Sequence, residues 1–345
     1  MDIPKEQRVG LRGMRDFYSN FDSFNVYSGV KSDLIISGNV NAPKFTVFIP
    51  TYKRSDTLRV TIESAINQFG ADSYEIVIIS NDPDGASGSV KELIESFNDD
   101  RIYYYVNEEN IGLCGNWNRG IELARGEYVA MIHDDDMLSP WFVSSVLKGI
   151  AEADGPDILG VSYVDFNSSN MPVFKDPGKL NYREVSKESF FWGRYINIAG
   201  MTVKREFMLK LGGYAEEFLP NEDTILIYQA LLNGRVVNIE SVLAGYRQEI
   251  NESLNGDTML NVVKTVEYTR RIIAEHEPFA KRWMNRFDRE YLYQFVASAN
   301  EKWKINLDPY QVLREVGLSS KRINRVRYLL MRVLRKIRMN TCKSR

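Results

Sequence analysis

The sequence predicts an α/β fold in which a mostly parallel sheet is flanked by helices and followed by a C-terminal helical region. Two observations lead to this prediction. Between residues 45 and 153, short apolar segments typical of strands buried on both faces alternate with segments whose apolar residues have helical spacing. From residue 259 onward the spacing is helical.

Length and composition limit the class of protein. The 345 residues, 44% hydrophobic and 26% charged, are typical of a globular protein with about two domains. The two cysteines, Cys114 and Cys342, are too few for a disulfide framework, and the two histidines, His133 and His276, belong to no cluster with zinc spacing. No signal-like apolar region or spanning segment is visible, so we expect a cytoplasmic protein.

We divide the chain into an N-terminal extension, a central α/β domain and a C-terminal helical region, at residues 1–42, 43–255 and 256–345. The extension is expected to have little regular structure, because glycine and serine interrupt its apolar runs. In the central domain, the expected strands are 45–49, 75–80, 102–106, 127–133, 158–165 and 236–247. The expected helices are 54–69, 90–97, 114–125, 140–153, 186–195, 205–211 and 225–232, with Gly126 capping the third.

Polar clusters follow three of the expected strands. They lie at residues 51–54, 81–85 and 134–136. Parallel sheets bind ligands at the carboxyl ends of their strands, so we expect the three clusters to form one site. Asp134, Asp135 and Asp136 repel one another, and a divalent cation such as Mn²⁺ or Mg²⁺ would account for them. A solvated acidic turn is the alternative interpretation.

Six motifs, taken together and in order, give the chain a family resemblance. They are FTVFIPTYKR at 45–54, EIVIISNDPDG at 75–85, NEENIGLCGNWNRGIELARGEY at 107–128, HDDD at 133–136, LGGYAEEF at 211–218 and NED at 221–223. On these motifs, residues 45 to about 250 resemble the family 2 glycosyltransferases. The resemblance implies a GT-A fold, with a Rossmann-like nucleotide-binding half and a mixed acceptor half.

The resemblance also implies an activity. It indicates an inverting, hexosyl-type transferase of the EC 2.4 class that moves a sugar from a nucleoside-diphosphate donor, with a UDP-sugar favoured, to a glycan or lipid-linked acceptor. Cell-surface polysaccharide synthesis is the expected setting. Two alternatives are a sugar-1-phosphate nucleotidyltransferase, whose glycine-rich loop is missing after Ile49, and a non-catalytic glycan- or membrane-binding scaffold.

The resemblance assigns donor contacts to the strand-end turns. Asp82 would accept hydrogen bonds from the base and ribose, or close an Asx-turn instead. Arg54 is either a phosphate contact or a surface charge. Asn116 and Asn118 flank Trp117, where relatives often carry an arginine; they either contact the donor or satisfy loop backbone. The implied donor-binding residues are Pro50, Thr51, Tyr52, Arg54, Asn81, Asp82, Asn116, Asn118, Asp134 and Asp135.

The resemblance assigns metal ligands to the acidic cluster. The family's more frequent pattern is Asp-x-Asp-Asp, whose first position is occupied here by His133. Asp136 is the implied direct ligand, with Asp134 and Glu249 as further ligands and Asp135 as a ribose or metal contact. Two registers of the family's D-x-D motif are open, Asp134 with Asp136 or His133 with Asp135, and His133 is interpreted as a strand-end residue rather than a ligand.

The implied catalytic residues are Asp223 and Glu222, with Asp223 preferred as the base that takes the acceptor proton. The alternative is that both acids simply favour a helix N-terminus capped by Asn221.

The C-terminal segment 321–345 is strongly basic. It contains ten cations and no carboxylate, and Ile323, Val326, Leu330, Val333 and Ile337 follow helical spacing within it. Such a basic amphipathic helix suits an anionic membrane surface, which would place the protein at the inner face of the plasma membrane. A helix docked on the body is the main alternative, and nucleic acid is not expected.

Overall fold

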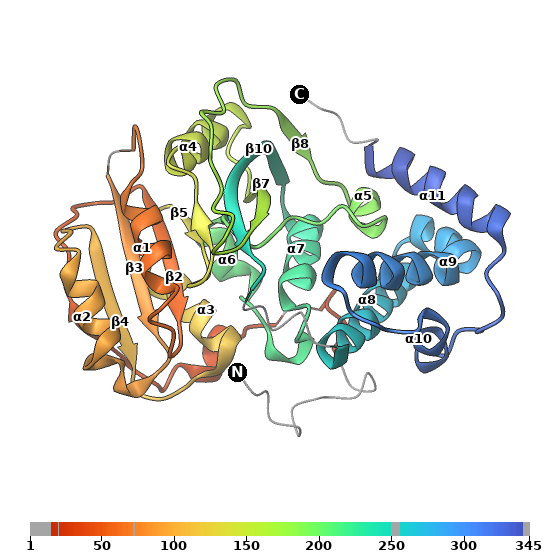
Figure 1. Ribbon diagram of the computed structural model, residues 1–345, viewed down its shortest axis with the longest axis horizontal. Helices are drawn as coiled ribbons and strands as arrows, with labels where there is room; N and C mark the ends of the chain where they lie inside the picture. The colour runs from red at the N-terminus through yellow and green to blue at the C-terminus, as the bar shows by residue number, and fades with distance from the viewer. Residues whose placement is uncertain (1–14, 20, 72, 250–255, 341–345) are drawn as a thin grey trace.

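The computed structural model describes residues 15–19, 21–71, 73–249 and 256–340. Within these residues, one ten-stranded sheet with the order β1-β4-β3-β2-β5-β9-β7-β10-β6 forms the central domain, and β8 pairs with β10. Helices flank this sheet, and the C-terminal helices form a separate group at its side (Figure 1). The predicted α/β fold, with a mostly parallel sheet and a C-terminal helical region, is confirmed.

Four adjacent parallel strands form the first half of the central domain. Every residue of the first two is buried, because helices cover both faces of the sheet. The strands are β2 (Phe45–Thr51), β3 (Tyr74–Ser80), β4 (Ile102–Asn107) and β5 (Tyr128–Met131). The connections contain α1 (Leu58–Ile66), η3 (Pro83–Ala86), α2 (Ser89–Ser96) and α3 (Gly112–Leu123).

The second half of the sheet is mixed. One strand, β9 (Met201–Lys204), runs antiparallel between β5 and β7, whereas β7 (Ile158–Phe166) and β10 (Val236–Arg247) are parallel to each other. Two short strands, β6 (Met137–Leu138) and β8 (Tyr182–Glu184), pair antiparallel with β10. The helices here are α4 (Phe142–Glu152), α5 (Lys187–Phe191), α6 (Arg205–Leu211), η4 (Glu216–Phe218) and α7 (Glu222–Asn233).

The N-terminal extension has more regular structure than the sequence predicts. After η2 (Phe24–Tyr27), the strand β1 (Ser32–Ile36) pairs antiparallel with β4 and closes that edge of the sheet. The Arg119 guanidinium holds the segment in place by donating to the Val30 carbonyl (2.8 Å) and to Ser32 Oγ (2.7 Å). A five-residue edge strand depends on such non-local partners, which are invisible in its own sequence.

Gly126 does not cap α3, contrary to the prediction. The C-cap is Ala124, which is extended, and Gly126 has no left-handed conformation. A Cβ atom on Gly126 would lie 2.7 Å from the Phe45 carbonyl carbon and the Thr46 nitrogen. The glycine therefore permits close approach of two backbone segments.

The C-terminal helices share their core with the central domain. The buried Arg270 guanidinium lies between the rings of Phe191 and Tyr291, 4.0 and 3.7 Å from their centroids, and its Nε donates to Asp288 Oδ1 (3.0 Å). The C-terminal helices are α8 (Gly256–His276), α9 (Pro278–Trp303), α10 (Pro309–Glu315) and α11 (Arg325–Asn340).

No helix in the described part of the chain is long and apolar enough to cross a membrane.

The packing of α3 on the sheet gives a stability prediction. A Cβ atom on Gly120 would lie 2.2 to 2.4 Å from three ring carbons of the fully buried Phe48. Although alanine favours helices by about 1 kcal/mol over glycine, overpacking costs about 1–3 kcal/mol, so Gly120→Ala should lower the melting temperature. Gly29→Ala, where no atom lies within 4 Å of the added carbon, is the control for thermal unfolding. A Gly120→Ala variant as stable as the wild type would contradict this packing.

Candidate active site

The acidic turn between β5 and β6 is fixed by elements on both sides. Thr61 in α1 donates through its hydroxyl to the Asp136 carbonyl (2.7 Å). At the end of β10, the Arg247 backbone N–H donates to Asp136 Oδ1 (2.9 Å), and Arg247 Nε donates to the Asp135 carbonyl (2.7 Å). The sheet therefore holds this turn in one conformation.

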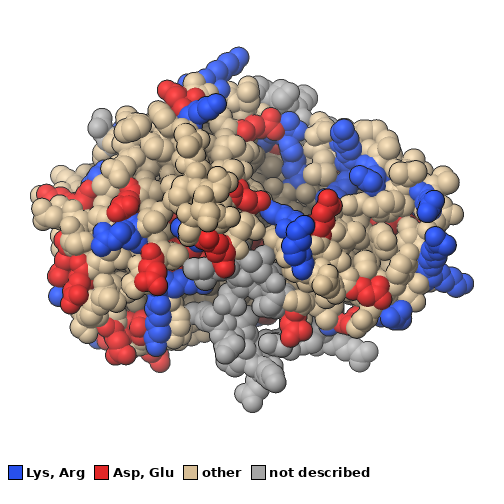
Figure 2. All heavy atoms as spheres, viewed as in Figure 1, with Lys and Arg blue, Asp and Glu red and all other residues tan. Residues whose placement is uncertain are grey.

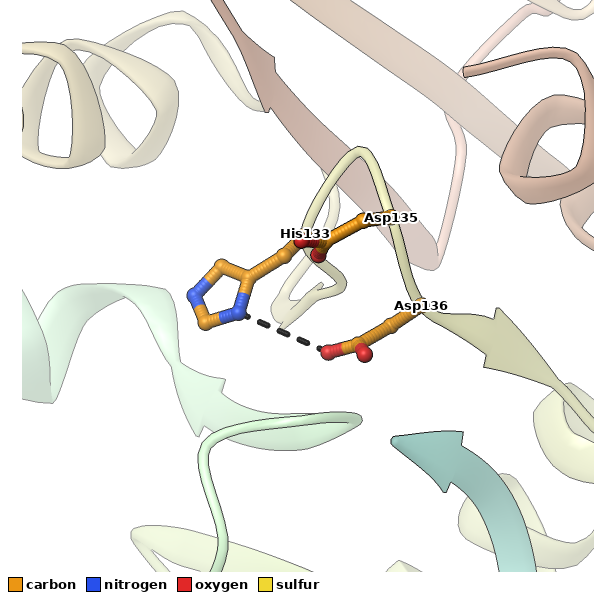
Figure 3. Close-up of side chains that lie close together, drawn as sticks. All are labelled: His133, Asp135 and Asp136. Carbon is orange, nitrogen blue, oxygen red and sulfur yellow. Dashed lines mark ion pairs between the residues drawn. The ribbon is translucent and has the colours of Figure 1, made fainter. Parts of the chain in front are cut away.

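One group of ligand atoms in this turn is suited to a metal ion. His133, Asp135 and Asp136 each offer an atom within 4.8 Å of the others, and Figure 3 shows the three side chains close together. His133 Nδ1 lies 3.5 Å from Asp136 Oδ2, a buried oxygen with no hydrogen-bond partner among the described residues. One imidazole and two carboxylates form a donor set that suits Mn²⁺. The predicted ligand Asp136 belongs to this group, and so does His133, which the sequence indicated only as a strand-end residue.

Asp134 lies outside this group among the described residues. Its Oδ2 accepts from Thr51 Oγ1 (2.8 Å), and its Oδ1 lies 3.4 Å from the Arg54 guanidinium. Arg54 makes a shorter ion pair, 2.7 Å, with Asp135. Burial raises the pKa of Asp134 to about 6, against the opposing charge of Arg54. Arg54 is thus the counter-charge of the acidic cluster, which the sequence did not indicate.

Glu249, the third predicted metal ligand, is engaged elsewhere. Its Oε2 accepts from the Ser168 backbone N–H (2.9 Å), the Ser168 hydroxyl (2.6 Å) and the Arg247 guanidinium (3.2 Å). These hydrogen bonds, those from Ser168 foremost, lower the pKa of Glu249. Within the described residues, its carboxylate is not part of the ligand group around Asp136.

Asn81, a predicted donor contact, has its amide fully occupied by protein groups. Its Nδ2 donates to Asn110 Oδ1 (2.7 Å) and to the Gly112 carbonyl (3.0 Å). Its Oδ1 accepts from Asn107 Nδ2 and from the Ile111 backbone N–H, both at 3.0 Å. The side chain is 1% exposed, so it organises the loop between β4 and α3.

Asn116 and Asn118 fit the second of their two interpretations, in which buried amides satisfy other protein groups. Asn116 Oδ1 accepts from Asn107 Nδ2 (2.9 Å). Asn118 bonds both ways with the backbone of Tyr214, accepting at 2.7 Å and donating at 2.8 Å. This pair of bonds fixes the LGGY turn beside α3.

Asp82 has the Asx-turn geometry that the sequence left open. It occupies the N-cap of η3, where its Oδ1 accepts from the Asp84 backbone N–H at 3.4 Å. The same oxygen lies 3.8 Å from the Lys53 ammonium. The cap does not exclude a donor contact, because it uses one carboxylate oxygen.

The end of β2 lies beside this turn. The Thr51 carbonyl accepts from the Asn81 backbone N–H (2.9 Å), so the two strand ends are joined. Pro50 is buried in β2 and Tyr52 is half-buried just after it. The three polar strand ends of the sequence analysis follow adjacent parallel strands, β3, β2 and β5, as predicted.

Glu222 and Asp223 begin α7. Glu222 is 5% exposed, and its Oε2 is buried with no hydrogen-bond partner among the described residues. Asp223 is half-buried, and its Oδ1 accepts from the Thr224 backbone N–H (2.5 Å). Burial, reinforced by the charge of Asp223, raises the pKa of Glu222 to about 8. Asn221 stands at the N-cap but does not cap by its side chain, which donates to the Val262 carbonyl of α8 instead.

Trp117 is a site residue whose role the sequence did not reveal. Its ring stacks on His133, with centroids 5.4 Å apart and planes at 24°, and meets Tyr214 edge-on at 5.0 Å. Burial lowers the pKa of His133, but the carboxylate of Asp136, 3.5 Å away, outweighs burial and raises the pKa to about 8. Trp117 therefore orients the imidazole of the ligand group.

Comparison with known proteins identifies the family. Residues 46–211 match the family described as Glycosyl transferase family 2. This segment is a family 2 glycosyltransferase domain. An uncharacterized glycosyltransferase of Methanocaldococcus jannaschii is 26% identical over 269 residues, which cover 75% of this chain and 89% of that protein. The GalNAc(5)-diNAcBac-PP-undecaprenol beta-1,3-glucosyltransferase of Campylobacter jejuni is 29% identical over 188 residues, 54% of this chain and 59% of that enzyme.

Solved glycosyltransferase structures share the fold. Staphylococcus aureus TarS 1–349 in complex with UDP-GlcNAc has a TM-score of 0.52 at 16% identity, covering 86% of this chain and 89% of that one. The mannosyltransferase PcManGT of Pyrobaculum calidifontis, in complex with GDP-Man and Mn²⁺, has a TM-score of 0.54 at 14% identity, covering 88% and 89%. The predicted GT-A fold is confirmed, and family membership makes the chain a transferase of the EC 2.4 class.

The buried state of Glu222 gives a pH prediction. The pKa of Glu222 is raised in the folded protein above its unfolded value of 4.5. The stability that the protonated Glu222 contributes is therefore fully present below pH 4.5 and is lost as the pH rises toward 8. Glu222→Gln cannot ionise, so its melting temperature relative to wild type should rise between pH 5 and pH 8 by about 2 °C or more. Glu206→Gln, an exposed site in α6, should show no such trend. A difference that is flat with pH would mean that Glu222 is not held in this raised state.

Proposed function

We propose that this glycosyltransferase moves a sugar, with inversion, from a nucleoside-diphosphate donor to a hydroxyl of a glycan or lipid-linked acceptor. One observation chiefly supports the proposal: within the ligand group, His133 Nδ1 faces Asp136 Oδ2 at 3.5 Å. The charge of His133 also acts, against the larger effect of burial, to lower the pKa of Glu222 and Asp223. This electrostatic influence supports a base in the same region as the diphosphate site, as group transfer requires.

The donor is a nucleotide sugar, and a UDP-sugar is the favoured choice. TarS was solved with UDP-GlcNAc and PcManGT with GDP-Man, which supports the class of donor. In this chain, Pro50, Thr51 and Tyr52 at the end of β2 would line the base pocket, and the second oxygen of Asp82 would accept from the base or ribose.

Asp136 and Asp135, with His133, would hold a divalent cation, Mn²⁺ or Mg²⁺. When bound, such an ion supplies Lewis-acid stabilisation to the leaving diphosphate. Asp136 Oδ2 supports this assignment, because it is buried, accepts no hydrogen bond among the described residues and faces His133 Nδ1 at 3.5 Å, so a bound cation would compensate its charge. Arg54 and Thr51 would keep Asp134 oriented beside the site.

Asp223 is the proposed base, and Glu222 assists it. Two adjacent buried carboxylates do not both ionise readily, and the raised pKa of Glu222 keeps that group protonated at neutral pH. The backbone N–H of Thr224 at the start of α7 stabilises the charge on Asp223. Asp223 is also the more exposed of the two, so it is the one able to take the proton of an acceptor hydroxyl.

The acceptor is proposed from a relative. The Campylobacter jejuni enzyme, by its name, adds glucose to a glycan carried on an undecaprenol diphosphate. A lipid-linked acceptor of that kind would place this chain in surface polysaccharide synthesis at the inner face of the plasma membrane.

The metal assignment is tested with Asp136→Asn. The amide keeps the acceptor for the Arg247 N–H but loses the negative charge, so Mn²⁺ affinity should fall at least about tenfold. Electron paramagnetic resonance measures the Mn²⁺ affinity. A thermal-shift comparison of UDP-, GDP- and dTDP-sugars in the presence of Mn²⁺ identifies the preferred donor. Asp33→Asn on the distant strand β1 is the matched control. Unchanged Mn²⁺ affinity in Asp136→Asn would remove Asp136 from the metal site.

The base assignment is tested with Asp223→Asn. Transfer should fall by about 10²–10⁴-fold, while donor affinity stays within about twofold, because only proton removal is lost. Release of nucleoside diphosphate and calorimetric donor binding provide the two readouts. Asp257→Asn, an exposed acid in the first turn of α8, is the control. Full transfer activity in Asp223→Asn would rule out this base.

A further inference from the structure

The C-terminal helix α11 is docked on the body by one face. Met331 on that face is fully buried, and Arg335 Nε donates to the Trp192 carbonyl (2.9 Å). The helix packs against α5 and α9, and Figure 1 shows it at the outer side of the helical group. The described part of the tail is therefore a fixed element of the fold.

The opposite face of α11 is apolar and exposed. Twelve large apolar side chains are exposed in the described part of the chain, and five of them lie on this one helix. Spaced at three, four and seven residues, they form a single stripe. They are Val326 (75% exposed), Leu329 (57%), Leu330 (46%), Val333 (56%) and Ile337 (52%). We call this set the apolar stripe.

Charge is divided between the two faces of α11. The acids of the body meet cations of the docked side, where Arg338 pairs with Glu188 (3.5 Å) and Arg327 with Glu290 (3.3 Å). Three further cations, Arg325, Arg332 and Lys336, are exposed and border the apolar stripe along one side. Figure 2 shows Lys and Arg side chains gathered over this end of the molecule. The outward surface is thus apolar with a cationic border.

We propose that the apolar stripe and its cationic border seat α11 in the headgroup region of an anionic lipid bilayer. Apolar side chains would enter the acyl boundary while Arg325, Arg332 and Lys336 meet lipid phosphates. A second copy of this face would offer the same cations and no acid to complement them, and nucleic acid would leave the stripe in water. The proposal concerns a surface and is independent of the chemistry proposed for the active site.

Vesicle sedimentation of the full chain tests the proposal. The wild type should bind vesicles of phosphatidylcholine mixed with phosphatidylglycerol at least tenfold more tightly than vesicles of phosphatidylcholine alone. The double variant Leu330→Asp with Val333→Asp should lose at least tenfold in binding to the mixed vesicles. The control carries the same changes at two exposed valines elsewhere, Val26→Asp with Val173→Asp, and should bind as the wild type does.

A charge variant separates the two components of the surface. Arg325→Glu with Arg332→Glu and Lys336→Glu should abolish the preference for anionic vesicles. Arg59→Glu with Lys91→Glu, on the nucleotide-binding half, should retain it. Thermal melting confirms that each variant folds. If the double aspartate variant does not fold, Leu330→Ser with Val333→Ser is used in its place.

Three outcomes would overturn the proposal. One is equal binding of the wild type to both kinds of vesicle. Another is unchanged vesicle binding in a folded stripe variant. The third is a wild-type dimer in light scattering that binds no vesicle and becomes a monomer when the stripe is altered; a second copy would then be the partner.

Discussion

Two buried carboxylates, Asp134 and Asp136, lie at the carboxyl edge of the sheet, and the arrangement of the site depends on how their charge is compensated. A carboxylate removed from water is strongly unfavourable without a charged or hydrogen-bonding partner. Thr51 and Arg54 supply partners for Asp134, and the backbone of Arg247 supplies one for Asp136. These partners come from the ends of β2 and β10, so the two halves of the sheet must meet at this turn.

The ligand group shows how an unusual residue is accommodated. The family resemblance places an acid at position 133, where this chain has an imidazole stacked on Trp117. The resemblance also indicates that relatives often carry an arginine where Trp117 stands. The two departures from the family pattern, His133 and Trp117, are therefore in contact with each other. The imidazole stacks on Trp117 and at the same time faces Asp136.

Local sequence patterns predicted the parallel half of the fold and the place of the acidic turn. Buried strands and amphipathic helices carry their own periodicity, so β2 to β5 were found directly, and the acidic turn was expected at the end of a strand. The strands β1, β6, β8 and β9 were not found, because each is short and depends on a partner far along the chain. Arg247 was missed for the same reason: its contact with Asp136 spans 111 positions. The roles of Asn81 and Asn118 likewise emerge only once their loops are folded.

The cation buried between Phe191 and Tyr291 sets the extent of the cooperative folding unit. The family match ends at residue 211, yet Arg270 of α8 bonds to α5 and α9 at once, and the Trp192 ring meets Trp283 at 5.5 Å. Removing the C-terminal helices would expose Phe191 and Trp192 to water. The segment that matches the family is therefore smaller than the packed unit, and a catalytic module cut at residue 211 would leave part of its core without a cover.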